Sequence, residues 1–163
     1  MKIERTSIVL IVVILLCVLL TQKASADELY IVATESTRQG SHNWFGFLEF
    51  EEVPFNFLLP NEFGDYKEEK FIVIMGSINE SKDIKDILSQ ILTEGEVKWL
   101  SRKGNGNLYL KSDIWTQGQK IAVVAGSDQN ALKKVRKANK EEWCDIIIEW
   151  FDLEGNPGSL LPY

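Results

Sequence analysis

Two Gly-Ser steps in this chain could hold an anion. Each follows an apolar run, Phe71–Met75 or Ile121–Ala125, and each precedes a helical pattern. At such a step glycine lets the backbone approach a ligand, and the amides and dipole of a helix N-terminus favour negative charge. Neither step has the spacing of a phosphate loop or of G-x-G-x-x-G, so we favour the alternative that glycine makes the turn and serine caps the helix. The candidate binding residues here are Gly76, Ser77, Gly126, Ser127 and Asp128.

The sequence supports a hydrolytic or metal-binding site less well than an anion-binding site. Ser127 lacks the Gly-x-Ser-x-Gly setting of a hydrolase elbow, and a Ser–His pair would have to use His42, the only histidine. One histidine and one mature cysteine disfavour a zinc site, and the acidic residues do not follow EF-hand spacing. We therefore assign no catalytic residue, no metal and no cofactor, and we expect a protein that is not an enzyme. A hydrolase with an unrecognised site is the least favoured alternative.

Five cations crowd one predicted helix of this acidic chain. They could form a docking face for an acidic partner, an anionic glycan or a lipid headgroup. The alternative, which we favour, is a solvated face whose later cations suit the helix C-terminus. The five cations are Lys133, Lys134, Arg136, Lys137 and Lys140.

Exposed aromatic residues on a secreted domain can stack on sugars or form a protein interface. The chain has five tryptophans, and most are expected in the core or at its edge. Trp44, which lies near a polar loop beside Phe45 and Phe47, is the tryptophan that we expect to be exposed.

The elements that would position these residues follow from hydrophobic patterning. The repeated strand–turn–helix unit predicts an α/β domain with a largely parallel, buried sheet, whose ligands would lie at the carboxyl ends of the strands. Strands are expected near 29–34, 55–59, 71–75, 120–125 and 145–151, and helices from Ser77 to Gly95 and from about Asp128 to Glu142. Residues 35–43 should form a loop, 44–52 fit a helix or a strand, and 97–102 with 108–111 predict a hairpin or two irregular strands.

The N-terminus has the pattern of a secretory signal peptide. Lys2 and Arg5 precede thirteen apolar residues, and Ala24-Ser25-Ala26 provides a cleavage site. An uncleaved membrane anchor is the alternative. We predict three parts: residues 1–26 as signal peptide or anchor, 27–152 as the α/β domain, and 153–163 as a C-terminal tail or linker.

The predicted mature chain, residues 27–163, is acidic and has a single cysteine. It holds 15 Lys and Arg against 23 Asp and Glu, a formal charge of −8, which argues against a nucleic-acid partner. Cys144 cannot form an internal disulfide and is expected to be buried as a small hydrophobic residue.

One segment of the chain resembles a known family. In Asp113–Asp128 a tryptophan, a turn with Gly and Lys, an apolar strand and Ala-Gly-x-Asp open an alanine-containing helix. This pattern is similar to one in archaeal surface-layer and related secreted envelope proteins, and more loosely to the flavodoxin-like domains of the periplasmic regulatory subunit of bacterial cellulose synthase. Phe71–Ser77 resembles the preceding strand of that unit, although Met75-Gly76-Ser77 stands where the family tends to have two glycines and a proline. The resemblance implies an extracytoplasmic structural or assembly role and brings no catalytic residues.

These observations give the following expectations. The chain is a three-layer α/β domain, flavodoxin-like or Rossmann-like, with a mostly parallel sheet behind an N-terminal signal peptide. It is secreted or held at the cell surface, where it acts as a non-catalytic structural or interaction domain with an envelope protein or glycan as partner. It contacts a membrane only through an uncleaved N-terminal segment. The alternative is a binding module for a glycan or small anion at the strand ends.

Overall fold

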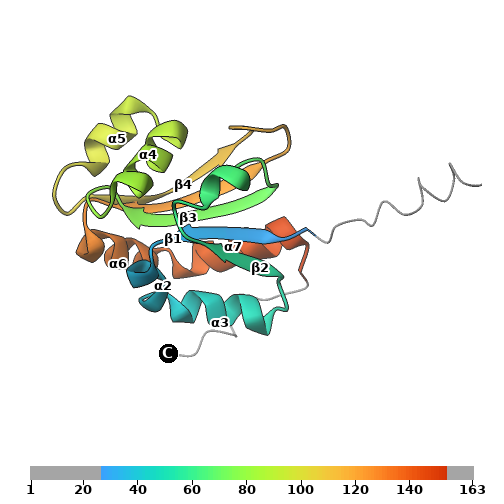
Figure 1. The fold of residues 1–163 in the computed structure, drawn as a ribbon. Coiled ribbons are helices and arrows are strands. Elements are labelled where there is room, and N and C mark those ends of the chain that lie inside the picture. Colours follow the sequence, from blue (N-terminus) through green and yellow to red (C-terminus); the bar gives the residue numbers. More distant parts are fainter. Residues whose placement is uncertain (1–26, 154–163) are drawn as a thin grey trace, which may run out of the picture.

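The structure, a computed structural model, describes residues 27–153 and has three layers, with one sheet between two sets of helices (Figure 1). The strand order is β2-β1-β3-β5-β4. The first four of these strands are parallel, and β4 pairs antiparallel with β5 at one edge. The strands are β1 (Leu29–Ala33), β2 (Phe55–Leu58), β3 (Phe71–Ser77), β4 (Gly106–Ser112) and β5 (Lys120–Gly126).

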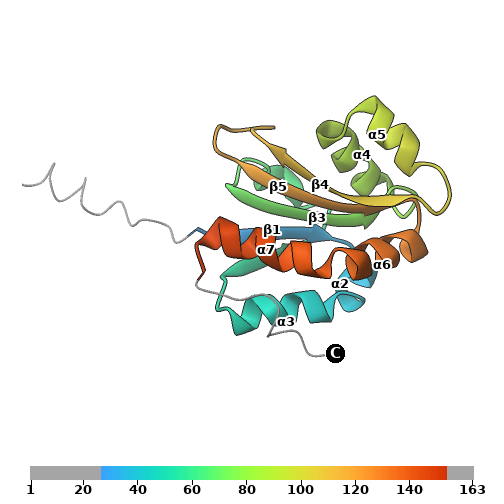
Figure 2. The ribbon, with the colours of Figure 1, turned by 180° about the vertical axis from the view of Figure 1, so that it is seen from behind.

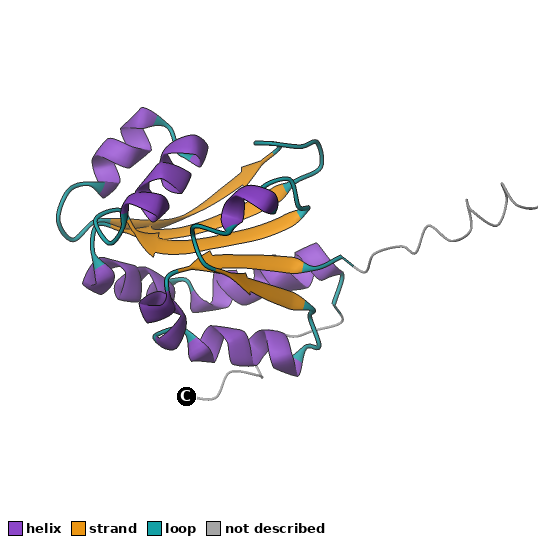
Figure 3. Cartoon of the chain, in the orientation of Figure 1, coloured by secondary structure: helices purple, strands orange, loops and turns teal. Residues whose placement is uncertain are grey.

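The described helices are divided between the two faces of the sheet, as the views from both sides show (Figures 2 and 3). One face carries α2 (Glu35–Gln39), α3 (His42–Phe50), α6 (Gln129–Ala138) and α7 (Lys140–Phe151). The other carries α4 (Lys82–Ile91), α5 (Glu94–Leu100) and the short 3-10 helix η1 (Phe63–Asp65). The expectation of a three-layer α/β domain with a mostly parallel sheet is confirmed.

Each face of the sheet has its own hydrophobic core. Along β1, Leu29, Ile31 and Ala33 join the core beneath α3, α6 and α7, whereas Val32 joins the core beneath α4. Every residue of β3 is buried, because this central strand is covered on both faces. That burial explains why β3 and β5 are continuous apolar runs rather than alternating ones.

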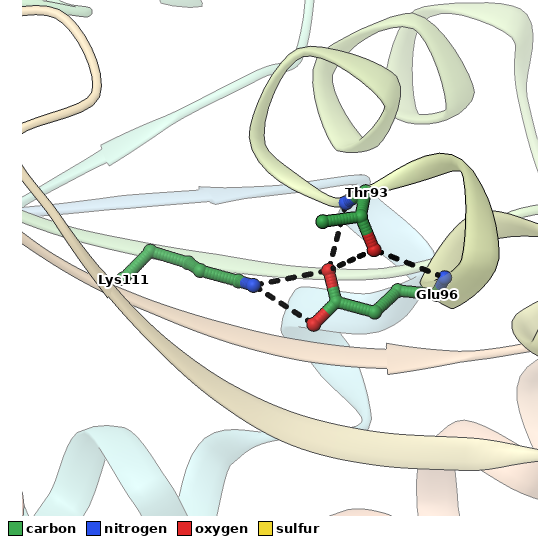
Figure 4. Close-up of polar contacts among 3 residues, drawn as sticks. All are labelled: Thr93, Glu96 and Lys111. Atoms are coloured by element: carbon green, nitrogen blue, oxygen red, sulfur yellow. Dashed lines mark hydrogen bonds and ion pairs between the residues drawn. The ribbon is translucent and has the colours of Figure 1, made fainter.

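The helices over the second face begin at side-chain caps. Ser81 caps α4, whose inward stripe includes Ile84 and Leu88. The helix ends at Ile91, so it neither begins at Ser77 nor reaches Gly95 as predicted. Thr93 and Glu96 then form a reciprocal capping box that starts α5 (Figure 4). The predicted hairpin is therefore wrong in its first half, since residues 97–102 lie largely in α5.

The predicted strand at 145–151 is also wrong, because this segment lies in α7. Its apolar run fits a buried strand, but Trp143, Cys144 and Ile147 recur at helical spacing and all face the core. The fifth strand is β4, whose residues are all half-buried or exposed, as suits an edge position. In addition, the predicted loop at 35–43 contains α2, and the ambiguous segment 44–52 is mainly the helix α3.

Two predicted segments lie wholly or mostly outside the described residues. The signal peptide or anchor, 1–26, is not described, and of the predicted tail, 153–163, only Leu153 is. Within residues 27–153 no helix has the length and apolar character needed to cross a bilayer.

Candidate functional site

The carboxyl ends of β1 and β3 are the place where an open α/β sheet binds a ligand, since the chain continues to opposite sides of the sheet from these strands. The carboxylate of Glu80, in the loop after β3, fills this position. It accepts hydrogen bonds from the hydroxyls of Thr34, of Ser36 at 2.7 Å and of Thr37 at 3.4 Å. The backbone amide of Ser77 also donates to it, at 3.4 Å. The carboxylate of Glu80 thus provides negative charge at the place where the connections after β1 and β3 leave to opposite sides of the sheet.

Gly76 and Ser77, the first pair of candidate residues, end β3. A Cβ on Gly76 would lie 2.7 Å from Cγ2 of Ile84, so the glycine allows α4 to pack closely on the strand. Ser77 is buried and pairs with Gly126 of β5. Both residues lie within β3, and their contacts are those of packing and sheet pairing. The expectation that glycine makes the turn and serine caps the next helix is wrong here, because the cap of α4 is Ser81.

Gly126 and Ser127, the second pair of candidate residues, are packed more tightly against their neighbours. A Cβ on Gly126 would lie 2.4 Å from the backbone nitrogen of Leu132, so only glycine fits beneath α6. The hydroxyl of Ser127 accepts from the amide of Gly104 at 2.9 Å and bonds with Asp128 Oδ2 at 3.1 Å. The amide of Ser127 donates to the carbonyl of Asn105 at 2.7 Å. Ser127 is fully buried and holds the loop before β4 against the end of β5.

Asp128 caps α6 through Oδ1, which accepts from the amide of Ala131 at 2.9 Å. This hydrogen bond, with smaller help from Ser127, keeps the pKa of Asp128 below its usual value. The bonds of Asp128 within the chain are those of a helix cap. His42, the only histidine, lies at the start of α3 and is not among the bonding partners of Ser127.

Trp44 is not exposed, contrary to expectation. Only 6% of it is accessible, and its ring stacks on that of Trp143 with 4.6 Å between centroids. The exposed aromatic residue of α3 is Phe50, at 63%.

Phe50 belongs to a recess between α3 and β2 that we call the aromatic groove. Its volume is about 550 Å³. The Phe45 ring lies 6.0 Å from that of Phe55 and 6.5 Å from that of Phe57, measured between centroids. Arg38 covers the Phe57 ring at 4.6 Å. The walls include Arg38, His42, Phe45, Phe50, Phe55 and Phe57.

A second recess borders the opposite side of β2, and we call it the acidic recess. Its volume is about 590 Å³, and it is lined in part by Asn56, Glu62, Asp65 and Tyr66. Two walls of different chemistry therefore flank a single strand. The sequence analysis missed this arrangement, although the alternation of Phe55, Asn56 and Phe57 is a signal for an edge strand with two unlike faces.

Among residues 27–153, no three His, Cys, Asp or Glu side chains gather in a group that could hold a metal ion. Comparison of the chain with protein-family models, with curated proteins and with solved structures finds no match.

Proposed function

We propose that this protein is an extracytoplasmic interaction domain of the cell envelope, and that it binds an extended segment of a partner protein along β2. The observation that carries the proposal is the position of β2. It is an edge strand with an apolar aromatic wall on one side and an acidic wall on the other.

The first argument concerns the backbone of β2. An edge strand presents amide and carbonyl groups that another strand can pair with, and proteins usually protect such edges with lysine, proline or a covering element. β2 contains neither lysine nor proline, and β1 is the one described strand that pairs with it. An added strand would gain main-chain hydrogen bonds here, as in other cases of β-strand addition.

The second argument concerns the side chains of the added strand. Successive side chains of a strand point to opposite faces. One set would enter the aromatic groove, where burial of each large apolar side chain contributes about 1.5–3 kcal/mol. The other set would face Glu62 and Asp65, which favour lysine or arginine. The expected ligand is therefore a segment in which apolar and basic residues alternate.

The chain's own C-terminal residues fit this description poorly. Residues 154–163 contain no lysine or arginine, and Pro157 and Pro162 cannot donate a main-chain hydrogen bond to a strand. A partner chain is thus the better candidate.

The cellular setting of the proposal comes from the sequence. The signal-peptide pattern before Asp27 and the resemblance of Asp113–Asp128 to secreted envelope proteins support a place at the cell surface. We also infer a flavodoxin-like arrangement, because the order β2-β1-β3 is that of the first three flavodoxin strands. A glycan or anion at the strand ends is less favoured, because Glu80 already provides negative charge there.

Photo-crosslinking in the native cell tests the proposal. A photoreactive phenylalanine analogue is placed at Phe50 in the aromatic groove and, in a second variant, at Glu62 in the acidic recess. We expect both variants to crosslink to one envelope protein, through neighbouring residues of a segment with alternating apolar and basic side chains. Mass spectrometry of the crosslinked peptides identifies that segment.

Leu110 provides the matched control, since it is 54% exposed on β4 at the opposite edge of the sheet. The same analogue at Leu110 should not capture the segment. Crosslinks to residues 154–163 or to a second copy of the chain would contradict the proposed partner. A chain found free and monomeric in the medium would contradict its place in the envelope.

A further inference from the structure

Three cations of α6 and Lys140 at the start of α7 line one recess together with Ser41 and Asn43. We call it the basic recess. Its volume is about 300 Å³. It lies between α6, the start of α7 and the corner between α2 and α3. The residues that give it its polar character are Ser41, Asn43, Lys133, Arg136, Lys137 and Lys140.

Arg136 forms the buried part of this recess. It is 8% exposed, and its Nη1 donates to the carbonyl of Thr37 at 3.3 Å and to the hydroxyl of Ser41. A guanidinium has five donor hydrogens, and these two bonds use a single nitrogen. Burial lowers the pKa of Arg136, and the nearby Glu80 carboxylate opposes that shift. Arg136 is thus a positioned cation with donor capacity to spare.

Negative side chains do not neutralise the recess. Its lining includes four cations and no carboxylate. The ion pairs within residues 27–153 involve Arg38, Lys70, Lys111 and Lys120, and none involves a cation of the recess. Glu80, the acidic group that acts on Arg136, is held by hydroxyls at the ends of the strands. A local excess of positive charge therefore persists on a chain whose net charge is −6.

The start of α7 adds a second favourable feature. Asn139 is the N-cap residue of this twelve-residue helix but forms no side-chain cap, because its amide donates instead to the carbonyl of Val135 at 2.8 Å. The first amides of α7 thus lack the side-chain acceptor that α4, α5 and α6 each have. Lys140, the first residue of α7, lines the recess. The negative end of the α6 dipole, at Ala138, offsets the positive end of the α7 dipole here, so the contribution of this helix start to anion binding comes from its amides.

We propose that the basic recess is a binding site for a phosphate group, either free or as a phosphate ester. A planar guanidinium matches two phosphate oxygens, and ammonium groups balance the remaining charge. The exposed side-chain amide of Asn43 supplies a neutral hydrogen-bond donor at the rim. The buried Ser41 hydroxyl instead donates to the carbonyl of Thr37 and accepts from Arg136, so it positions the guanidinium. The cations of this site do not line the aromatic groove beside β2, although Asn43 lines both recesses, and the site does not depend on the proposed function.

The test follows backbone amide resonances of the whole 163-residue chain, kept in neutral maltoside micelles, during titration with inorganic phosphate at constant ionic strength. We expect saturable shifts at Asn43, Lys137 and Lys140 that sodium chloride alone does not cause. The double variant Lys137→Gln/Lys140→Gln should weaken binding about tenfold or more, because it removes two positive charges that would form charge-assisted hydrogen bonds with the phosphate. Unchanged core resonances establish that the variant is folded.

Lys134→Gln is the matched control, because Lys134 is an exposed cation of α6 that does not line the recess. Its effect should be less than about twofold, since it removes only distant, screened charge. Equal weakening by Lys134→Gln and by the double variant would overturn the proposal, as would equal responses to phosphate and chloride. Arg136→Lys keeps the charge but removes the planar fork, so it should also weaken phosphate binding.

A second titration distinguishes the source of the phosphate group. Short-chain phosphatidic acid in the same micelles presents the group as a lipid headgroup. Tighter binding of this lipid, with competition by inorganic phosphate, would support a headgroup site. Tighter binding of inorganic phosphate would support a site for a free phosphate. Failure of both titrations would overturn the site and leave the crosslinking test at β2 unaffected.

Discussion

The Glu96 carboxylate joins the start of α5 to β4. It accepts from the Thr93 amide at 2.7 Å and from the Thr93 hydroxyl at 3.0 Å, and Lys111 Nζ lies 2.8 Å and 3.0 Å from its two oxygens (Figure 4). Burial by itself would raise the pKa of Glu96, but the bonds from Lys111 and Thr93 outweigh it and lower the pKa. Ionised Glu96 therefore stabilises the folded state.

We expect Glu96→Gln to lower the free energy of unfolding by about 1 kcal/mol at pH 7, since the ion pair is partly screened by solvent. A carboxylate whose pKa is lowered by folding stabilises fully above its unfolded pKa of about 4.3, and loses that effect as pH falls through its folded pKa. The difference between wild type and variant should thus be constant above about pH 5 and shrink below about pH 4. Urea unfolding at several pH values measures it. Glu94→Gln, at an exposed residue of the same turn, should change stability less.

Cys144 illustrates how burial controls reactivity. The thiol is fully buried, and burial raises its pKa to about 11. Because the thiolate is the reactive form, Cys144 should resist a thiol reagent at pH 8 in the folded protein and react on unfolding in urea. The measurement uses the Cys17→Ser variant, so that Cys144 is the only thiol. Rapid reaction of the folded protein would contradict the buried position.

At the scale of elements, Gly126 determines how closely α6 approaches β5. A Cβ there would meet the backbone of α6, which cannot move aside by a change of side-chain rotamer. We expect Gly126→Ala to destabilise the protein by about 1–3 kcal/mol or more, as overpacking does. Urea unfolding tests this. The control is Gly64→Ala in η1, where a Cβ would meet no atom within 4 Å and stability should change by less than about 0.5 kcal/mol. Equal effects of the two substitutions would show that packing under α6 does not require glycine.

At the scale of the whole molecule, the two hydrophobic cores share one sheet. β1, β3 and β5 each contribute alternate residues to both cores. The loss of either helical layer would therefore expose one face of the central strands. We expect residues 27–153, expressed alone, to unfold in one cooperative transition, with circular dichroism and tryptophan fluorescence giving the same midpoint. Two separate midpoints would contradict this coupling.

A shorter fragment provides the control for this prediction. A chain of residues 27–139 lacks α7 and with it Trp143, Cys144 and Ile147, which are buried in the first core. This fragment should fail to show a cooperative transition, because Trp44 and Leu48 would lose the layer that covers them. A cooperative transition of the shorter fragment would show that α7 is dispensable.

The sequence by itself determined the elements whose pattern is local. Strands buried on both faces are continuously apolar, so β3 and β5 were predictable from their apolar runs. The apolar stripe of α4 was predictable from its helical period. The expected turns and caps were wrong, because Gly76 and Gly126 lie at the ends of strands, and Ser81 and Asp128 cap the helices that follow. The net charge, the two cysteines and the signal-peptide pattern were also read directly from the sequence.

Tertiary structure decided whatever depends on contacts between distant segments. The apolar run 144–151 fits a strand or a helix equally well until its neighbours are known, and only the fold makes it the helix that covers Trp44. The same holds for the sites. Glu80 reaches the hydroxyls after β1, and Arg136 reaches Ser41, across 43 to 95 residues of chain. Periodicity reports which face of an element is apolar, but not which element lies against it.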